Sequence, residues 1–457
     1  MNACPKLEEL DINTDSPVVI VGLGKTGLSC AKYLQAQNIA FEVMDSRAQP
    51  PGLEELKRDC GRTPVSTGCF DEVLLNKASL LLLSPGVSLK TPEIDRQRLR
   101  GVPLYGDVEL FAQTVTAPVV AITGSNGKST VTALLAEMAE QAGRKVKMGG
   151  NIGTPVLELL DEPDVDLFVL ELSSFQLETT CALKLKAAVV LNVTPDHMDR
   201  YDNMNEYLSA KLKIFDHADS VVLNKDDPLL SECGVPENAQ QLSYGLEGAE
   251  DAQFSVMKEG PDEYLMFNQK RLMSVNEIAM VGRHNVSNAL AALALGYAAG
   301  LPFQAMVNTL KTFSGLAHRS QKIAEHNGVK WVNDSKGTNV GATIAAVKGI
   351  EGRVVLIAGG IAKDADFSPL LAVLNEKVDE LILLGRDAEL IRSQLSGYSG
   401  HVVRVANLEE AVETAARLAT PEDTVLLSPA CASFDMFSGF EERGERFIAA
   451  VENVIAS

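Results

Sequence analysis

The sequence lacks the features that would place the chain in a membrane or mark it for export. Its apolar runs are short, as in Leu80–Leu83, whereas a helix needs about 20 apolar residues to span a bilayer. The first residues, MNACPKLEELDIN, contain neither the basic stretch nor the apolar stretch of a signal peptide. We therefore expect a soluble cytoplasmic protein with no membrane partner.

Cysteine and basic residues are also scarce. The seven cysteines are scattered, with no C-x-x-C pair and no metal-ligand spacing, so reduced thiols are the simplest expectation. The 61 aspartates and glutamates outnumber the 41 lysines and arginines, and the formal net charge is −20. Repulsion of phosphate argues against nucleic acid as a partner. A local cluster of basic residues could still bind an anionic small molecule.

The most informative stretch is Pro118–Thr130, PVVAITGSNGKST. Its apolar first half predicts a buried parallel strand, and apolar periodicity after Lys128 predicts a helix. A strand, a glycine-rich turn, Lys-Ser and a helix together wrap phosphates, and the serine can reach Mg²⁺. Two residues separate the first glycine from Gly-Lys instead of the four of a Walker A loop, so an ordinary turn is the alternative. We predict a nucleoside triphosphate site formed by Gly124, Ser125, Asn126, Gly127, Lys128, Ser129 and Thr130.

A second glycine-rich turn lies near the N-terminus. The segment Ser16–Gly27 carries G-x-G-x-x-G after an apolar run, and the next predicted strand, Ile39–Met44, is followed by Asp45. This spacing is close to the dinucleotide fingerprint, in which the acid binds ribose hydroxyls. Alone it indicates only that a nucleotide with a diphosphate could lie here. For the turn Ser84–Gly86, after another predicted strand, a ligand site and a plain loop stay equally open.

Charged residues at the ends of apolar runs mark the middle of the chain. Glu171 ends such a run, where a buried acid is costly unless it is paired or binds metal, so we expect a Mg²⁺ ligand there. His197 lies in the acid-rich loop NVTPDHMDRY, for which we favour function over structure. Lys211 and Lys213 lie on a predicted helix. From the residues alone, both are expected to be solvated.

The last part of the chain alternates predicted strands with helices. Strands are expected at residues 329–332, 354–358, 380–384, 402–405 and 424–427, which predicts a third parallel α/β sheet. Before it, residues 245–275 are expected to form a small antiparallel excursion, and Asn285 to cap the following helix. Cys431 is interpreted as a packing residue. The length and these patterns predict three domains, at residues 1–106, 107–314 and 315–457.

Several motifs together resemble those of the Mur ligase family, and they cover nearly the whole chain. These are TGSNGKST, ELSSFQLE, NVTPDHMDRY, GRHNVSNALAA, HRSQ, NDSKGTN and SPACASFD. The resemblance implies a Rossmann-like N-terminal domain, a central P-loop ATPase-like domain with a parallel sheet, and a Rossmann-like C-terminal α/β domain. The chain is most similar to the member that adds D-glutamate to UDP-N-acetylmuramoyl-L-alanine (UDP-MurNAc-L-Ala) in peptidoglycan precursor synthesis. A monomer is expected.

The resemblance also implies a reaction. ATP would convert the substrate carboxylate to an acyl phosphate, and the amine of D-glutamate would then displace phosphate, with two Mg²⁺ ions as cofactors. Ser129 and Glu171 would hold one ion, and Glu171 and His197 would help to hold the second. Lys211 matches a lysine that the family carbamylates. Lys128, His197 and Lys211 are the implied catalytic residues.

Further contacts are implied by the same resemblance. They are Asn288, Arg319 and Asp334 for ATP; Thr26, Asp45, Ser46, Arg47 and Gly86 for the UDP portion; Asn151 and Ser173 for phosphate and substrate; and Lys336, Thr338, Lys363, Ser433 and Phe440 for D-glutamate. Two positions depart from the family pattern. Gln321 stands where the family usually has glutamate, and Ser46 stands where threonine is expected.

Three other functions stay open. An NAD-dependent dehydrogenase would rest on GLGKTG and Asp45 and would leave the phosphate loop unexplained. A folylpolyglutamate synthase resembles the second and third domains but lacks the first. A nucleotide switch would exchange nucleotide without substrate-dependent release of phosphate.

Overall fold

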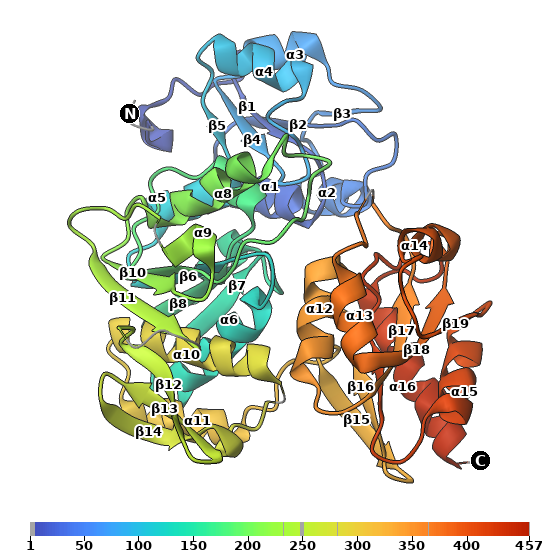
Figure 1. Cartoon of the computed structure of the whole chain (residues 1–457). Coiled ribbons are helices and arrows are strands. Elements are labelled where there is room, and N and C mark those ends of the chain that lie inside the picture. The colour runs from blue at the N-terminus through green and yellow to red at the C-terminus, as the bar shows by residue number, and fades with distance from the viewer. Residues whose placement is uncertain (1–4, 232, 247–250, 281, 364, 457) are drawn as a thin grey trace.

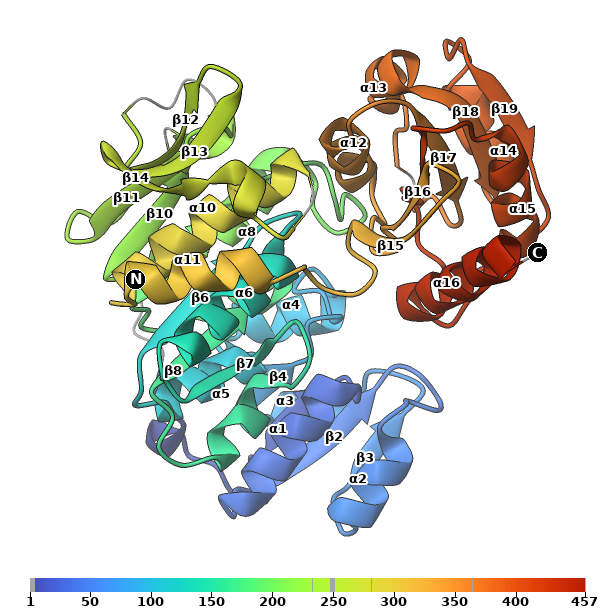
Figure 2. The same cartoon turned by 90° about the horizontal axis from the view of Figure 1, so that it is seen from below.

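The computed structural model describes residues 5–231, 233–246, 251–280, 282–363 and 365–456. They form three α/β lobes, each built on its own sheet (Figure 1). The N-terminal lobe lies against the central lobe, and the C-terminal lobe stands on another side of the central lobe, as the view from below also shows (Figure 2). The predicted α/β fold class with three sheet-containing domains is confirmed.

The N-terminal domain is a five-stranded parallel sheet in the order β3-β2-β1-β4-β5, which is the Rossmann order. Every residue of β1 and β4 is buried, because helices cover both faces of such a sheet. The strand order reverses between β1 and β4, so a ligand is expected at the carboxyl ends of these strands. The elements are η1 (Leu7–Glu9), β1 (Val18–Val21), α1 (Lys25–Ala36), β2 (Phe41–Asp45), α2 (Leu53–Asp59), β3 (Val65–Thr67), α3 (Glu72–Lys77), β4 (Leu80–Leu83), α4 (Pro92–Leu99) and β5 (Leu104–Tyr105).

The central domain has a nine-stranded sheet in the order β14-β13-β12-β11-β10-β9-β6-β8-β7. It is parallel from β12 to β7, and the expected antiparallel excursion is its edge, since β12, β13 and β14 pair antiparallel. The first elements are α5 (Asp107–Thr114), β6 (Val119–Thr123), α6 (Lys128–Gln141), β7 (Val146–Gly150), η2 (Val156–Asp161), β8 (Leu167–Glu171), α7 (Ser174–Glu178), β9 (Ala187–Val190), α8 (Met204–Leu212) and η3 (Lys213–Phe215). The others are β10 (Ser220–Asn224), α9 (Pro228–Ser231), β11 (Gln240–Gly245), β12 (Phe254–Glu259), β13 (Asp262–Phe267), β14 (Lys270–Ser274), η4 (Val275–Glu277), α10 (Arg283–Ala298) and α11 (Phe303–Thr312).

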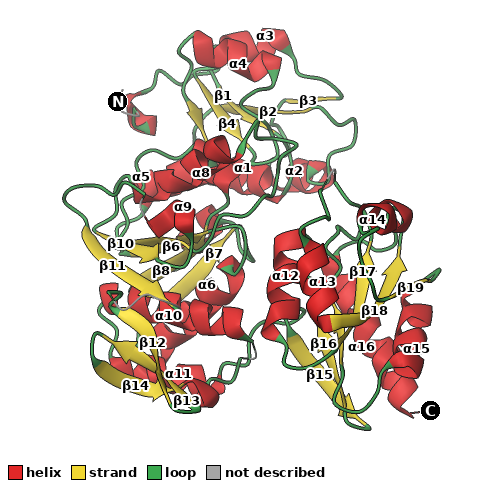
Figure 3. Cartoon of the chain, in the orientation of Figure 1, coloured by secondary structure: helices red, strands yellow, loops and turns green. Residues whose placement is uncertain are grey.

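The C-terminal domain has a six-stranded sheet in the order β15-β16-β20-β17-β18-β19. The five expected strands are parallel, and β15 adds an antiparallel edge that the sequence did not predict (Figure 3). Its residues, QKIAEH, are polar and only partly buried, as is common at a sheet edge. The elements are β15 (Gln321–His326), β16 (Val329–Asn333), α12 (Val340–Gly349), β17 (Val354–Gly359), α13 (Leu370–Lys377), β18 (Val378–Leu384), α14 (Ala388–Gln394), β19 (His401–Arg404), α15 (Leu408–Leu418), β20 (Thr424–Leu427) and α16 (Phe440–Ala456).

The expected helix cap at Asn285 is wrong. Helix α10 begins at Arg283, and its N-cap is Gly282, whose φ of +101° favours glycine. Asn285 lies in the first turn instead, buried, and its Oδ1 accepts a hydrogen bond from Asn288 Nδ2 at 3.0 Å. The two asparagines therefore hold each other on the inner face of the helix.

The expectation of reduced thiols is wrong for Cys181, which is disulfide-bonded. Whether two cysteines meet depends on the tertiary approach of their side chains, which spacing in the sequence does not reveal. Cys30, Cys60, Cys69, Cys233 and Cys431 are free. Burial raises the pKa of the Cys431 thiol to about 12, in agreement with a packing role. In the part of the chain that the structure describes, no helix has the length and apolarity needed to cross a bilayer.

Candidate active site

Three adjoining cavities lie between the domains. The N-terminal cavity lies at the carboxyl ends of β1 and β4, the central cavity lies over the loop after β6, and the interdomain cavity lies between the second and third domains. Asn151 and Gly153 line both the N-terminal and the central cavity. Asn126, Arg319 and Lys336 line both the central and the interdomain cavity. The three cavities therefore form one row.

The predicted phosphate loop joins β6 to α6, and Lys128 is the first residue of that helix. Gly127 has a φ of +83°, and a Cβ on it would stand 2.6 Å from Oδ1 of Asn288. Both observations explain why a glycine is needed there. The backbone N–H of Asn126 donates to Asn192 Oδ1 at 2.8 Å, which fixes the loop to the segment after β9. The loop is thus fixed at the N-terminus of α6, where anions bind.

Glu171 lies at the centre of a hydrogen-bond chain that joins predicted site residues from several elements. The hydroxyl of Ser129, on α6, donates to Glu171 Oε2 at 2.5 Å. Nδ2 of Asn151, which follows β7, donates to Glu171 Oε1 at 2.7 Å. Arg319 reaches over from the C-terminal side and donates to the Ser129 hydroxyl at 2.5 Å. The neighbouring positions of β6, β8 and β7 in the sheet bring these side chains together.

The donors around Glu171 fit a magnesium ion. The Glu171 side chain is 2% exposed, and the partners of its two oxygens, Ser129 and Asn151, are both neutral. A buried carboxylate is stabilised by a cation, and hydroxyl and carboxylate oxygens are ligands that Mg²⁺ accepts. Among the described residues, no group of three or more His, Cys, Asp or Glu side chains could hold a metal ion. Phosphate oxygens and water would therefore have to complete the coordination.

Lys211 is buried, and the expectation of a solvated side chain is wrong for it. Its side chain lies under the phosphate loop, where Nζ donates to the carbonyl oxygen of Gly124 at 3.0 Å and lies 4.4 Å from the ring centroid of Tyr207. Burial, together with the nearby ammonium of Lys128, lowers the pKa of Lys211 well below its ordinary value. Lys213, two residues further along, is exposed as expected.

His197 lies in the loop after β9 and lines the central cavity. Its φ of +58° is unusual for a residue other than glycine. The imidazole packs edge-on against the ring of Phe175, with 4.8 Å between the centroids, and its Nε2 lies 3.7 Å from Asp196 Oδ2. Burial lowers the pKa of His197, which favours the neutral imidazole that metal ions bind.

The interdomain cavity contains the other residues predicted to bind ATP. Thr130, Asn288 and Asp334 line it together with Arg319. Asp334 is buried, and burial raises the pKa of its carboxyl group to about 6. Its Oδ2 accepts a hydrogen bond from Ser428 Oγ at 2.7 Å, which fixes the carboxyl group at the carboxyl ends of β16 and β20. A carboxyl group held in this way can accept hydrogen bonds from ribose hydroxyls.

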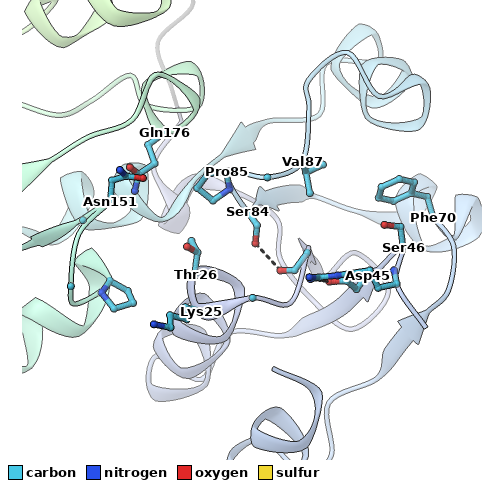
Figure 4. A pocket seen from close by; sticks show the side chains of 17 residues that line it. Lys25, Thr26, Asp45, Ser46, Phe70, Ser84, Pro85, Val87, Asn151 and Gln176 are labelled. Carbon is cyan, nitrogen blue, oxygen red and sulfur yellow. Dashed lines mark hydrogen bonds and ion pairs between the residues drawn. The ribbon is translucent and has the colours of Figure 1, made fainter. Parts of the chain in front are cut away.

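The N-terminal cavity brings together all five residues predicted to hold UDP, namely Thr26, Asp45, Ser46, Arg47 and Gly86. Figure 4 labels Thr26, Asp45 and Ser46 among them. Burial works to raise the pKa of Asp45, but hydrogen bonds from Arg47 and from the Leu23 backbone outweigh it and hold the pKa at about 2. In Figure 4, Asn151 and Gln176 from the central domain lie across the cavity from Asp45 and Ser46. Residues of two domains therefore line the cavity.

The C-terminal domain supplies one wall of the central cavity. Lys336, Thr338, Lys363 and Phe440 line it, as predicted for the amino-acid site. The Nζ of Lys336 lies 3.9 Å from the ring centroid of Phe440, and burial lowers the pKa of Lys336 to about 8. Ser433 lies elsewhere: it is 3% exposed and lines none of the three cavities.

The remaining predicted residues either line the central cavity or form hydrogen bonds that support other residues of the site. Ser125, Gly127, Asn151 and Ser173 line the central cavity, whereas Gly124 contributes its carbonyl oxygen to Lys211. Gln321 Oε1 accepts a hydrogen bond from the backbone N–H of His318 at 3.0 Å, so the amide supports the loop that carries Arg319. Phe175, Tyr207 and Asn339 also line the central cavity, although the sequence did not predict a functional role for them. All but Tyr207 lie within or directly beside the quoted motifs, but nothing in their spacing indicates a function.

Three family models match successive parts of the chain. They are the Mur ligase MurD-like N-terminal domain at residues 16–106, the Mur ligase middle domain at residues 122–296, and the Mur ligase glutamate ligase domain at residues 318–431. A curated protein named UDP-N-acetylmuramoylalanine–D-glutamate ligase, from Nitrosococcus oceani, is 48% identical over 98% of this chain and 99% of its own. A protein of the same name from Pseudomonas savastanoi is 50% identical over 95% and 97%.

Solved structures show the same fold at much lower identity. The MurF ligase from Thermotoga maritima in complex with ADP has a TM-score of 0.61 and 16% identity, with 91% of this chain and 95% of that chain covered. A pseudomurein peptide ligase from Methanothermus fervidus has a TM-score of 0.60 and 20% identity, with 96% and 100% covered. At these identities the likeness concerns the fold alone.

Proposed function

The chain belongs to the Mur ligase family, and from this premise we propose that it joins D-glutamate to UDP-MurNAc-L-Ala. The reaction would consume ATP, release ADP and phosphate, and serve peptidoglycan precursor synthesis. Two relatives named UDP-N-acetylmuramoylalanine–D-glutamate ligase are 48% and 50% identical to the chain over nearly its whole length, which supports the proposal.

One observation carries the proposal at the level of residues: the three cavities adjoin in a row. UDP would occupy the N-terminal cavity, near Asp45 and Arg47, and ATP the interdomain cavity, near Asn288 and Asp334. Both cavities share residues with the central cavity, so the substrate carboxylate and the γ-phosphate would meet over Lys128. A dehydrogenase would require neither the phosphate loop nor the central cavity.

The first chemical step is phosphoryl transfer. An oxygen of the substrate carboxylate attacks the γ-phosphorus, the bond to the β-phosphate oxygen breaks, and ADP leaves. Lys128 and the N–H groups of the loop would stabilise the negative charge on the transferring group. Ser129 and Glu171 would hold a Mg²⁺ ion, which neutralises charge on the phosphate oxygens when it is bound.

The second step forms the amide. The amine of D-glutamate attacks the acyl carbon, phosphate leaves, and the nitrogen loses a proton. Lys336, Thr338 and Lys363 line the wall where the carboxylates of D-glutamate would lie, and two of these side chains are cationic. Positioning of the amine against the acyl group is the main contribution that such a wall can make.

We also propose that Lys211 is carbamylated. Its neutral amine would attack CO₂, form a C–N bond and release one proton, and the product would carry a negative charge in place of the ammonium. The depressed pKa of Lys211 and its place beside Lys128 support this change, because a carbamate would remove the repulsion between two cations. The carbamate and His197 would help to hold a second Mg²⁺ ion.

The decisive experiment is an assay of ADP release. With ATP and Mg²⁺, release should require both UDP-MurNAc-L-Ala and D-glutamate, and L-glutamate should not replace D-glutamate. Release without the UDP substrate, or with L-glutamate at the same rate, would contradict the proposal.

We further infer a cytoplasmic monomer with no nucleic-acid partner, and sedimentation of the purified protein should give the mass of one chain.

A further inference from the structure

Arg200 joins the N-terminal domain to the reaction centre. It lies in the loop after β9, where its backbone N–H donates to the His197 carbonyl oxygen at 2.9 Å. Its guanidinium donates to the carbonyl oxygens of Pro85 and Val87, at 2.8 and 3.3 Å. It also donates to Glu178 Oε2 at 2.7 Å, and the side chains of both residues are largely buried, with exposed fractions of 11% and 14%.

The same guanidinium stacks on an aromatic wall of the central cavity. Its carbon Cζ lies 4.1 Å from the ring centroid of Phe175, and Phe175 packs against the imidazole of His197. Both Phe175 and His197 line the central cavity, whereas Pro85 and Val87 line the N-terminal cavity. One side chain therefore contacts a wall of each cavity and lines neither of them.

We propose that Arg200 is a positioning residue that sets the distance between the UDP-binding loop and the phosphoryl-transfer centre. This inference rests on the proposed function, in which one substrate reaches from the N-terminal cavity into the central one. A substrate held at both ends reacts only when the two sites have the right separation, and a misplacement of 1 Å can cost roughly 100-fold in rate.

Arginine suits this role better than lysine would. Its planar guanidinium directs several N–H donors along fixed directions and offers a flat face to an aromatic ring. An ammonium at the same place could not keep two backbone carbonyls, the carboxylate of Glu178 and the ring of Phe175 in one arrangement. Arg200→Lys should therefore keep the positive charge but lose the fixed arrangement of hydrogen bonds and ring stacking.

The test compares binding of the whole substrate with binding of its nucleotide end. In Arg200→Lys, kcat/KM for UDP-MurNAc-L-Ala should fall at least tenfold, while KM for ATP and Kd for UDP stay within about threefold of wild type. Glu178→Gln, which keeps the arginine and its bonds to the loop, should show a smaller loss. Lys213→Met is the matched control, because Lys213 donates to the Glu178 carbonyl oxygen at 3.1 Å from an exposed position. It should behave like wild type.

Hydrogen exchange supplies a readout that needs no substrate. In Arg200→Lys, the backbone amides of Ser84 and of residues 86–88 should exchange faster, while those of α11 keep the wild-type rate. Unchanged exchange in Ser84 and residues 86–88 would overturn the proposal, and so would an equal loss in affinity for UDP and in kcat/KM. If wild type releases no ADP with the two substrates, the proposed function fails, and the exchange comparison still decides whether Arg200 fixes the loop.

Discussion

Lys128 and Lys211 donate to the same carbonyl oxygen, that of Gly124, at 2.8 and 3.0 Å. Two ammonium groups that share one acceptor repel each other, and burial disfavours the charge of each. Desolvation lowers the pKa of both lysines, and the Lys128 charge adds to the effect at Lys211. Burial and mutual repulsion therefore disfavour the ammonium form of both lysines, and they lower the pKa of Lys211 well below its ordinary value.

Replacement of Lys211 should test whether this amine is carbamylated. If the carbamate forms, Lys211→Ala should lose most activity, roughly 100-fold, because a ligand oxygen and a negative charge are missing. A short carboxylate such as acetate should restore part of the activity by filling the vacated space. Steady-state ADP release with and without added carboxylate is the measurement.

The helix supplies the control for that experiment. Lys213 is exposed, and its Nζ donates to the Glu178 carbonyl oxygen and not to the phosphate loop, so Lys213→Ala should be nearly silent. Equal losses at Lys211 and Lys213, or full activity of Lys211→Ala, would contradict a role for the buried amine.

Lys128→Ala should abolish ligation while the fold is kept. The missing group is a cation, so we expect a loss of roughly 100-fold or more, and added carboxylate should not restore activity. Circular dichroism should be that of wild type. Retention of more than about a tenth of the activity, a loss below about 1.4 kcal/mol, would mean that the phosphate-loop assignment is wrong.

The N-terminal domain should not use NAD. Its cavity carries the G-x-G-x-x-G turn and Asp45, but Arg47 holds both oxygens of that carboxylate, at 2.9 and 2.6 Å. An acid engaged in this way is less available to ribose hydroxyls than the free acid of a dinucleotide site. Fluorescence titration should show no saturation by micromolar NADH. Saturable binding that UDP-MurNAc-L-Ala displaces would count against the assignment.

The parts of the site that directly follow a strand could be predicted from the sequence. Ligands bind at the carboxyl ends of parallel strands, and each such end can be recognised from the residues of its own strand. Glu171 and the phosphate loop each follow a buried apolar run, and adjacent strands in one parallel sheet bring their carboxyl ends together. Burial that depends on packing between distant segments could not be predicted. Lys211 looks like an exposed helix residue until α8 packs beneath the loop of Gly124. The edge strand β15 has too few apolar residues to be predicted as a strand from the sequence.

Lys336 should give the reaction a pH limit on the alkaline side. Burial, with Arg319 nearby, lowers the pKa of Lys336 to about 8, so the ammonium is present below that pH and is lost above it. If Lys336 holds a carboxylate of D-glutamate, kcat/KM for D-glutamate should fall roughly tenfold per pH unit above 8. Lys336→Arg should lack this limb, since arginine keeps its charge. The substrate amine titrates identically in both proteins, so a shared limb would exclude Lys336 as its cause.

Arg443 should stabilise the C-terminal domain although its hydrogen-bond partners are neutral. Its guanidinium is 2% exposed on α16 and donates to the carbonyl oxygens of Ser335 and Cys431, at 2.7 and 3.3 Å, and to Ser335 Oγ at 3.0 Å. Arg443→Met would leave these acceptors buried without donors, and we expect the free energy of unfolding to fall by about 3 kcal/mol. Arg446, on the same helix, forms an exposed ion pair with Glu409, so Arg446→Met should cost less than about 1 kcal/mol. Urea denaturation of both variants measures the difference. Equal midpoints would show that water or side-chain rearrangement satisfies the acceptors without Arg443.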